Sequence, residues 1–299
     1  DLIDVTYEVL PHVIDVEDAM KPDAPVLHDD MITQGMNPAP TKASNIAKVI
    51  TFAKGDAEAG FKDAEVIVEG RYTTKPVHQA YIEPHACLAS YAADGQVSIH
   101  ASSQGHFMIR AYTAKLLGID MANIRVNPAE IGGGFGGKTL VYLEPVALAL
   151  SQRSGRPVKL VMSRDEVFRA TGPTSGAVMD VSIGATRDGK ITGAKVDARF
   201  QAGAFPGSPI ATGLMCAVTA YDVPDFRLDG WDVVTNTPKT AAYRAPGAPI
   251  IAFAVESALD ELAAKLGIDP LELRRRNAVQ NGMQAAYGPV FENIGFVET

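Results

Sequence analysis

The sequence predicts an α+β fold in which mixed, largely antiparallel sheets pack with helices. Alternating apolar stretches flank Asp94-Gly95 and Asp188-Gly189, and a two-residue turn of this type joins antiparallel strands. Three stretches with helical spacing of apolar residues stop at Gly118, Gly155 and Gly267. Glycine readily adopts the left-handed conformation that ends a helix, so these positions support both the helices and their ends.

The N-terminal part is predicted to be mostly irregular. Residues 2–10 alternate in part and are rich in β-branched residues, which indicates a strand ended by Pro11. A short helix is expected around residues 15–20. Residues 21–48 carry four prolines together with glycine and asparagine, so they are predicted to be irregular chain, with a boundary near residue 55.

The remaining elements follow from the spacing of apolar residues, which alternates in a strand and recurs every three or four residues in a helix. Strands are expected at residues 64–72, 86–91, 96–101, 123–126, 158–162, 177–185, 191–200 and 228–234. Helices are expected at residues 105–117, 139–152 and 250–266. A last helix begins at Asp269-Pro270-Leu271-Glu272, where cap, proline and glutamate all stand at the positions that favour a helix start.

Composition limits the class of protein. The 299 residues are 46% hydrophobic and 21% charged, enough for one large domain or two ordinary ones with a sizeable core. Lys and Arg total 27 against 35 Asp and Glu, a net charge of -8, and without a basic stripe no nucleic acid partner is expected. With neither an export segment nor an apolar run of roughly 18 residues, we predict a cytoplasmic protein without a membrane partner. Cys87 and Cys216 lie in apolar contexts and are predicted to be buried thiols.

A glycine-rich loop is the main candidate site. It supplies five glycines in the six positions from Gly132 to Gly137, after the strand at 123–126 and before the helix at 139–152. Glycine lets the backbone approach a ligand that a Cβ would keep away. Free backbone N–H groups at a helix start attract anions, so we expect an anion site here.

Two alternatives exist for this loop. Residues Gly132 to Thr139 fit the P-loop pattern of NTPases, in which Lys138 would reach phosphates and Thr139 would hold magnesium. Against it stand the bulky ring of Phe135 and the lack of a downstream apolar run that ends in Asp. Alternatively the loop only packs protein against protein, in a non-catalytic assembly or binding module without cofactor.

Six sequence blocks together resemble the molybdenum hydroxylases, the family of xanthine dehydrogenase, aldehyde oxidase and aerobic carbon monoxide dehydrogenase. The blocks occur in the family's order and cover roughly residues 60–280. They are Glu83-Pro84-His85, Ser102-Ser103-Gln104, Gly132 to Lys138, Gly155-Arg156-Pro157-Val158, Ser163-Arg164-Asp165-Glu166 and Ala242 to Pro249. The resemblance implies the molybdopterin-binding domain of the aldehyde oxidase/xanthine dehydrogenase type, with residues 1–55 a remnant of a preceding lobe and a connector. Residues 56–299 would be the first molybdopterin-binding domain, in one part or in two subdomains that meet near 165–175.

The resemblance also implies a cofactor and its contacts. Molybdenum would be carried by molybdopterin, in its dinucleotide form, and not by protein side chains. The backbone of Gly133, Gly134, Phe135 and Gly136 would line the pterin. The Gln104 side chain would hydrogen-bond the metal's oxo group, and Arg244 would brace the cofactor from a second glycine turn.

Each of these residues also has a purely structural alternative. Gln104 would cap the helix at 105–117, Arg244 would be a surface charge, and Phe135 would be a core ring. Three further groups have an expected structural role. Glu83 and His85 would pin the sheet to a loop, Lys138 and Thr139 would be structural, and Arg164, Asp165 and Glu166 would form a solvated or capping cluster.

Departures from the family's patterns narrow the substrate. Thr139 stands where purine-oxidising members have a glutamate, and Thr212 lies near the position of their arginine. Ala245 replaces the cysteine that carries the copper bridge in carbon monoxide oxidisers, and Pro246 replaces an aromatic clamp. Xanthine and carbon monoxide are therefore disfavoured, which leaves oxidation of an aldehyde or an aromatic N-heterocycle with water as oxygen source.

The resemblance finally implies parts outside this chain. The family's general-base glutamate lies in a second half of the molybdenum subunit, and this sequence begins at Asp1 as if cut from a longer polypeptide. We therefore expect a fragment that needs a second molybdopterin-binding lobe and is inactive alone. Iron–sulfur and FAD partners, as subunits or domains, would accept the electrons.

Overall fold

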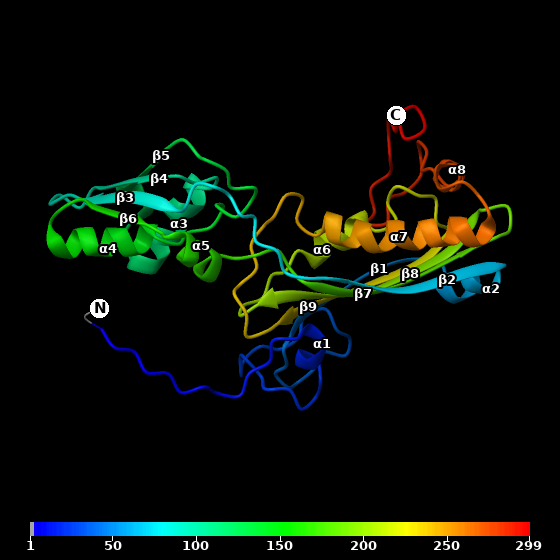
Figure 1. Cartoon of the computed structure of the whole chain (residues 1–299), viewed down its shortest axis with the longest axis horizontal. Coiled ribbons are helices and arrows are strands. Elements are labelled where there is room, and N and C mark those ends of the chain that lie inside the picture. Colours follow the sequence, from blue (N-terminus) through cyan, green and yellow to red (C-terminus); the bar gives the residue numbers. More distant parts are fainter. Residues whose placement is uncertain (1–2) are drawn as a thin grey trace. The chain divides into compact units, whose positions relative to one another are not determined.

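A computed structural model describes residues 3–299 and divides into two compact units (Figure 1). Unit 1 comprises the chain up to Lys75 together with Ser175–Thr237 and Gly247–Thr299. Unit 2 comprises Pro76–Thr174 and Pro238–Pro246. The predicted boundary near residue 55 falls inside unit 1. The chain passes from unit 2 back to unit 1 after Thr174, which is at the end of the range 165–175 where two subdomains were expected to meet.

The described chain forms eight α-helices, one 3₁₀ turn and nine strands. The helices are α1 Val16–Ala19, α2 Ala57–Lys62, α3 His106–Leu117, α4 Glu144–Ser154, α5 Arg164–Ala170, α6 Ile210–Cys216, α7 Ala248–Leu266 and α8 Pro270–Arg276, with η1 at Met121–Asn123. The strands are β1 Ile46–Lys54, β2 Val66–Thr74, β3 Ala86–Tyr91, β4 Val97–Ala101, β5 Ile124–Pro128, β6 Val158–Val161, β7 Ala177–Ala185, β8 Ile191–Gly203 and β9 Asp225–Val234.

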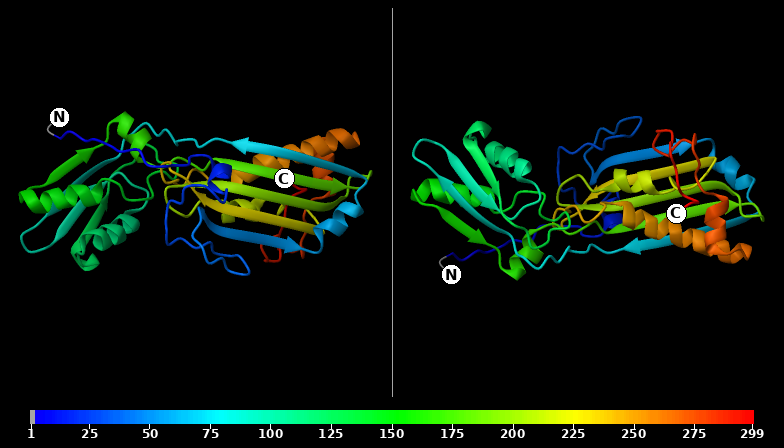
Figure 2. Two further views of the ribbon diagram at one scale, coloured as in Figure 1. Left: turned by 90° about the horizontal axis from the view of Figure 1, so that it is seen from below. Right: turned by 90° about the horizontal axis from the view of Figure 1, so that it is seen from above.

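Unit 1 is built on a five-stranded sheet in the order β1-β9-β8-β7-β2. All neighbours are antiparallel except β8 and β9, which run parallel. Helix α7 crosses one face of this sheet and α1 lies on the other, as the two views of Figure 2 show. The mixed, mainly antiparallel sheet confirms the predicted fold class for this unit.

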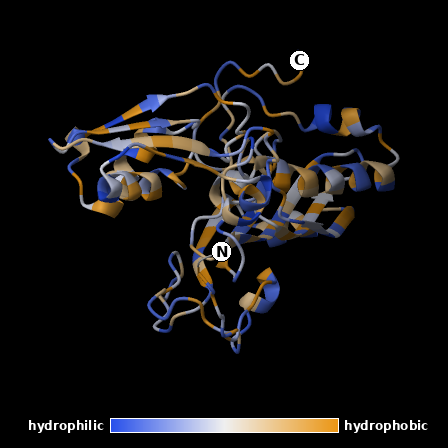
Figure 3. Ribbon diagram, turned by 60° about the vertical axis from the view of Figure 1, so that its left-hand side comes forward, coloured by the Kyte–Doolittle hydropathy of each residue, from blue (hydrophilic) through white to orange (hydrophobic). Residues whose placement is uncertain are grey.

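Alternation along the strands places the core of unit 1 under α7. On β7 the side chains of Ala177, Met179, Val181 and Ile183 are buried and join one apolar cluster with the inner face of α7. The ribbon in Figure 3 accordingly mixes hydrophobic and hydrophilic colours along the strands. Successive side chains of a strand point to opposite faces, so the alternation read from the sequence specified which face became the core.

Unit 2 has a four-stranded sheet in the order β5-β4-β3-β6. The hairpin of β3 and β4 is antiparallel, as predicted, and β5 runs parallel to β4. Helices α3 and α4 supply Ile109 and Leu148 to the core below one face of the sheet. On the other face Leu88 is exposed, so this sheet is covered on one side within its own unit.

The predicted helix ends are confirmed. Helices α3, α4 and α7 stop at Gly118, Gly155 and Gly267, which have φ values of 65°, 64° and 68°. At the start of α8, the side chain of Asp269 accepts hydrogen bonds from the backbone N–H groups of Leu271 and Glu272. Glycine termination and side-chain capping are local effects, which is why the sequence alone located them.

Three expectations about the elements are wrong. The strand predicted at 2–10 is absent over residues 3–10, which are extended and without a strand partner, and Ile3 is 83% exposed; residue 2 lies outside the described part. Residues 46–54, assigned to the irregular connector, form the edge strand β1. The helix predicted from 139 begins only at Glu144. An extended segment becomes a strand only where another strand supplies hydrogen bonds. The local residue pattern does not show whether such a strand lies beside it.

Candidate functional site

The glycine-rich loop of unit 2 has a backbone that needs its glycines. Gly133 and Gly136 have φ values of 93° and 102°, and Phe135 between them has a φ of 50°. Side chains other than glycine are strained in this region. The loop does not lead directly into a helix, because α4 starts at Glu144. The predicted help from a helix dipole is therefore wrong, and only the loop's own N–H groups remain for an anion.

The second glycine turn packs against the first. The backbone N–H of Arg244 donates to the carbonyl oxygen of Phe135 at 2.9 Å. A Cβ on Gly136 would lie 2.6 Å from the carbonyl oxygen of Ala242, so only glycine permits this approach. Arg244 and Ala245 both have positive φ, 22° and 60°. Two segments distant in sequence thus form one continuous surface.

Gln104 links this surface to the sheet. Its side-chain oxygen Oε1 accepts a hydrogen bond from the backbone N–H of Gly136 at 2.8 Å. The backbone N–H of Gln104 donates to the carbonyl oxygen of Lys138 at 2.9 Å. The residue does not cap α3, because Gly105 holds the cap position without a side-chain hydrogen bond. Since Oε1 is fixed, the amide Nε2 is left free of hydrogen bonds within residues 3–299 and can donate to a ligand.

The glycine-rich loop and the second glycine turn, together called the joined turns, leave further hydrogen-bond donors available. Throughout the described chain, the backbone N–H groups of Gly133, Gly134 and Phe135 donate no hydrogen bond, and the exposed Arg244 side chain has no ion pair. Phe135 is 47% exposed, so its predicted alternative as a core ring is wrong. A Cβ on Gly134 would lie 2.5 Å from Oε1 of Gln104. Unpartnered amides, a guanidinium and a face free of Cβ atoms fit an anionic, extended cofactor that is held by backbone donors.

Lys138 excludes the P-loop interpretation. Its side chain is 0% exposed and its ammonium Nζ lies 2.7 Å from Oε2 of Glu83. Thr139 donates its hydroxyl to the carbonyl oxygen of Gly136 at 2.8 Å. Neither side chain is free to hold a phosphate or a magnesium ion, so the alternative function as a P-loop NTPase is wrong, while the expected structural roles of both residues are confirmed.

A buried polar network lies beside the loop. The Tyr81 hydroxyl and Nε2 of His85 share a hydrogen bond of 2.6 Å, and both residues are buried. Burial, aided by the nearby charge of Lys138, lowers the pKa of His85 to about 4. The imidazole is therefore neutral at physiological pH. The expected structural role of His85 is confirmed, but no sequence motif pointed to its partner Tyr81.

The remaining candidates are structural or isolated. Ser163 and Glu166 form a capping box at the start of α5, which confirms the capping role expected for that block. Cys87 is buried, but Cys216 is exposed, so the prediction of two buried thiols is wrong for the second. Across residues 3–299, no cluster of three or more His, Cys, Asp or Glu side chains is arranged to bind a metal ion. None of the helices described has the length and hydropathy of a membrane span.

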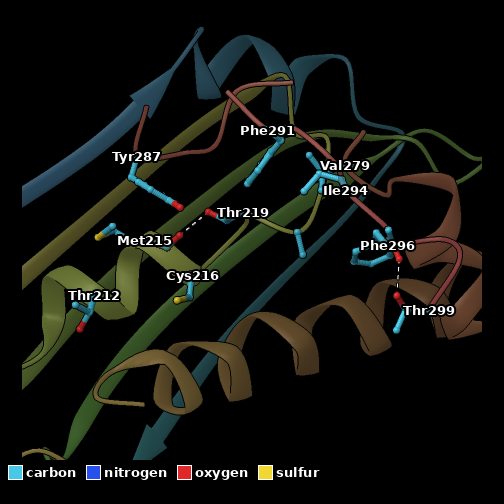
Figure 4. Close-up of a pocket in the computed structure, with 12 residues that line it drawn as sticks. Thr212, Met215, Cys216, Thr219, Val279, Tyr287, Phe291, Ile294, Phe296 and Thr299 are labelled. Carbon is cyan, nitrogen blue, oxygen red and sulfur yellow. Dashed lines mark hydrogen bonds between the residues drawn. The ribbon is translucent and has the colours of Figure 1, made fainter. Parts of the chain in front are cut away.

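A cavity with a volume of about 970 Å³ lies in unit 1. Figure 4 shows Met215 and Cys216 on α6, and Tyr287 and Phe291 of the C-terminal segment, among its lining side chains. The lining is mainly apolar, with a few threonine and tyrosine hydroxyls, and contains no charged side chain. It offers no donors comparable to those of the joined turns, which makes the turns of unit 2 the better candidate for an anionic cofactor.

The joined turns present unpartnered backbone donors on one surface, and the comparisons with known proteins identify the family to which the chain belongs. Residues 38–278 match the family described as the molybdopterin cofactor-binding domain. The chain belongs to this family and is a molybdopterin-binding part of a molybdenum hydroxylase. The resemblance found in the sequence blocks is thereby confirmed, together with the fold type that it implied.

The chain is similar to several known enzymes. The chain is 31% identical to the nicotinate dehydrogenase large molybdopterin subunit of Eubacterium barkeri, over 100% of this chain and 68% of the relative. Its fold matches the aldehyde oxidoreductase from Desulfovibrio gigas with a TM-score of 0.86 and 29% identity, over 96% of this chain and 31% of the other. It matches quinoline 2-oxidoreductase from Pseudomonas putida 86 with a TM-score of 0.87 and 25% identity, over 97% of this chain and 37% of the other. The chain thus spans only about a third of the two solved relatives.

Proposed function

We propose that the joined turns of unit 2 bind the molybdopterin cofactor. The contacting residues in this proposal are Gln104, Gly133, Gly134, Phe135, Gly136 and Arg244. The observation that carries it is the hydrogen bond between Arg244 and Phe135, which brings both family motifs to one surface. The amides at 133–135, unpartnered within the described chain, and the exposed guanidinium give that surface donors of the kind that anionic cofactor groups require.

Each residue has a distinct task in this proposal. When bound, the molybdenum cofactor supplies the two-electron oxidation of a C–H bond with water as the source of oxygen. The backbone amides of the loop would orient the cofactor, and Nε2 of Gln104 would donate toward its metal side while Oε1 stays bound to Gly136. The guanidinium of Arg244 would offset negative charge, with a fork of donors that a lysine lacks. Donors fixed before binding are effective because they need no reorganisation.

For the substrate we propose an aldehyde or an aromatic N-heterocycle. Some relatives are named for xanthine, hypoxanthine or carbon monoxide, whereas nicotinate dehydrogenase, quinoline 2-oxidoreductase and aldehyde oxidoreductase have names of these two classes. The residues of this chain agree, because Thr139 and Ala245 stand where the family's purine and carbon monoxide oxidisers have a glutamate and a cysteine. Since the solved relatives are much longer than this chain, the activity belongs to the complete protein.

We further propose the parts that complete the enzyme. These are a second molybdopterin-binding lobe with the general-base glutamate, iron–sulfur and FAD partners that accept the electrons, and a pterin in dinucleotide form. The isolated 299-residue chain should then show no turnover. A cytoplasmic location stays a prediction, which fractionation of cells would check.

The proposal is tested on the complete protein with its subunits. Metal analysis should find stoichiometric molybdenum, and acid treatment should release a nucleotide from the pterin. Oxidation assays should show activity with aldehydes or N-heterocycles and little with xanthine or carbon monoxide. A complete protein without molybdenum would support the rival function, a non-catalytic assembly or binding module, and would end this proposal.

A further inference from the structure

The ends of the glycine-rich loop share one anchor, the carboxylate of Glu83. Its oxygen Oε2 accepts the backbone N–H of Gly132 at 2.7 Å, where the loop begins. The same oxygen accepts Nζ of Lys138 at 2.7 Å, where the loop ends. The hydroxyl of Ser102 donates to it at 2.6 Å. One oxygen atom thereby holds both ends of the loop and the end of the neighbouring strand β4.

The pair of Glu83 and Lys138 is unusual because the lysine is wholly buried. The Lys138 side chain is 0% exposed, whereas that of Glu83 is 33% exposed. The ammonium nitrogen Nζ of Lys138 also lies 4.9 Å from the centre of the Tyr81 ring. A buried ammonium is unfavourable without a counter-ion, and among the described carboxylates Glu83 is the one that pairs with it. The position of Lys138 therefore depends on Glu83.

The anchor continues to the residues that face the cofactor. The carbonyl oxygen of Lys138 accepts the backbone N–H of Gln104 at 2.9 Å and the hydroxyl of Ser103 at 2.9 Å. Gln104 in turn holds the N–H of Gly136. Lys138 thus sets the position of Gln104 and, through it, the middle of the loop.

We propose that Glu83 is a positioning residue of the cofactor site, which acts through Lys138 to hold the glycine-rich loop in its binding conformation before the cofactor arrives. The inference rests on the proposed function of the loop. Glycines allow a chain many conformations, so fixing five of them costs conformational entropy. A tether at both ends removes that cost from the binding step.

The state of the carboxylate agrees with this role. Burial by itself would raise the pKa of Glu83, but the hydrogen bonds from Lys138, Ser102 and Gly132 outweigh it and hold the pKa below its usual value. The group is therefore ionised at physiological pH and keeps the charge that Lys138 needs. Neutralising Glu83 without changing its shape should release the loop.

The test uses Glu83→Gln, Lys138→Met and the double variant in the complete protein. Hydrogen exchange of the amides at 132–138 reports loop order, metal analysis reports molybdenum content, and the midpoint of thermal unfolding, Tm, reports global stability. Glu83→Gln should speed exchange of these amides by about tenfold or more, as expected when a hydrogen bond to a charged group is lost. It should also lower molybdenum content and Tm. Glu65→Gln is the control, because Glu65 pairs with Arg187 at the exposed surface of unit 1.

The double variant separates positioning from stability. It removes both charges, so Tm should recover, while loop exchange stays fast and molybdenum content stays low because the tether is absent. If loop exchange, molybdenum content and Tm all recovered in the double variant, the proposal would be overturned and the pair would have a purely stabilising role. Native exchange rates and native molybdenum content in Glu83→Gln would overturn it as well. If wild-type protein carried no molybdenum, the function of the site would fail, while the exchange data would still decide whether Glu83 orders the loop.

Discussion

Arg244 donates its backbone N–H to the carbonyl oxygen of Phe135 at 2.9 Å, and this bond joins two turns that are far apart in the sequence. The order of the family motifs along the chain indicated one cofactor site, but not how the motifs meet. The bond supplies that relation inside a single unit of the structure.

Gly134→Ala should displace Gln104 without unfolding the protein. The new Cβ would lie 2.5 Å from Oε1 of Gln104, at the flexible end of a side chain, so the amide moves and its bond to Gly136 is lost. We expect a loss of about 1 kcal/mol in the free energy of unfolding and a severalfold drop in molybdenum content, measured by denaturation and metal analysis. Gly295→Ala is the control, since its Cβ would have no neighbour closer than 3.8 Å. Full molybdenum content in Gly134→Ala would contradict the role of the loop.

Gln104→Glu should separate the two functions of this side chain. Glutamate keeps an acceptor for the N–H of Gly136 but removes the Nε2 donor, so stability should change by less than about 0.5 kcal/mol. The oxidation rate of the complete enzyme should fall by about a hundredfold, the usual loss when one oriented donor is removed. Steady-state kinetics with matched molybdenum loading checks this. Gln96→Glu, on a turn of unit 2, should leave the rate unchanged, and an equally normal rate in Gln104→Glu would remove Gln104 from the site.

Arg244→Met should weaken cofactor binding while the fold stays intact. The side chain is exposed and has no ion pair with any described residue, so its loss should cost less than about 0.5 kcal/mol of stability. Molybdenum content should fall, because the variant removes a positive charge that would offset the negative charge of the cofactor. Arg153→Met is a matched control at the exposed end of α4. If both variants retained equal molybdenum, Arg244 would be an ordinary surface charge.

The neutral His85 should make stability depend on pH. Its pKa is about 4 in the folded protein against 6.5 for an unperturbed histidine, so between these values the unfolded chain binds the additional proton. Stability should therefore fall as pH decreases, by about 2 kcal/mol from about pH 7 to about pH 5. Denaturation of wild type and His85→Gln at both pH values isolates this contribution, because Glu83 titrates below that range. Parallel curves for the two proteins would mean that His85 is not held neutral.

Local signals in the sequence predicted much of the fold. Hairpins at Asp94-Gly95 and Asp188-Gly189 and helix ends at three glycines appeared where expected, because turn chemistry depends on a few neighbouring residues. Strand β1 was missed, since its pairing with β9 is a long-range contact. The short helices α2, α5 and α6 were missed as well, because six or seven residues give too little periodicity to recognise.

The candidate site was predictable only as a set of residues. Family motifs identified Gln104, the glycine-rich loop and Arg244 as candidate residues. They did not indicate that Lys138 is buried against Glu83, because that burial depends on how three segments meet in the folded chain. The P-loop pattern matched letter by letter and was still misleading. A motif specifies residue types, whereas the availability of a side chain is decided by tertiary packing.

The contrast between the two cysteines leaves one accessible thiol in this 299-residue chain. Burial raises the pKa of the Cys87 thiol to about 12, which suppresses the reactive thiolate, while Cys216 is exposed and lines the apolar cavity. In this chain a maleimide dye should therefore attach to Cys216 and leave Cys87 unlabelled. Its fluorescence would then report on whatever enters or covers that cavity as the complete enzyme assembles.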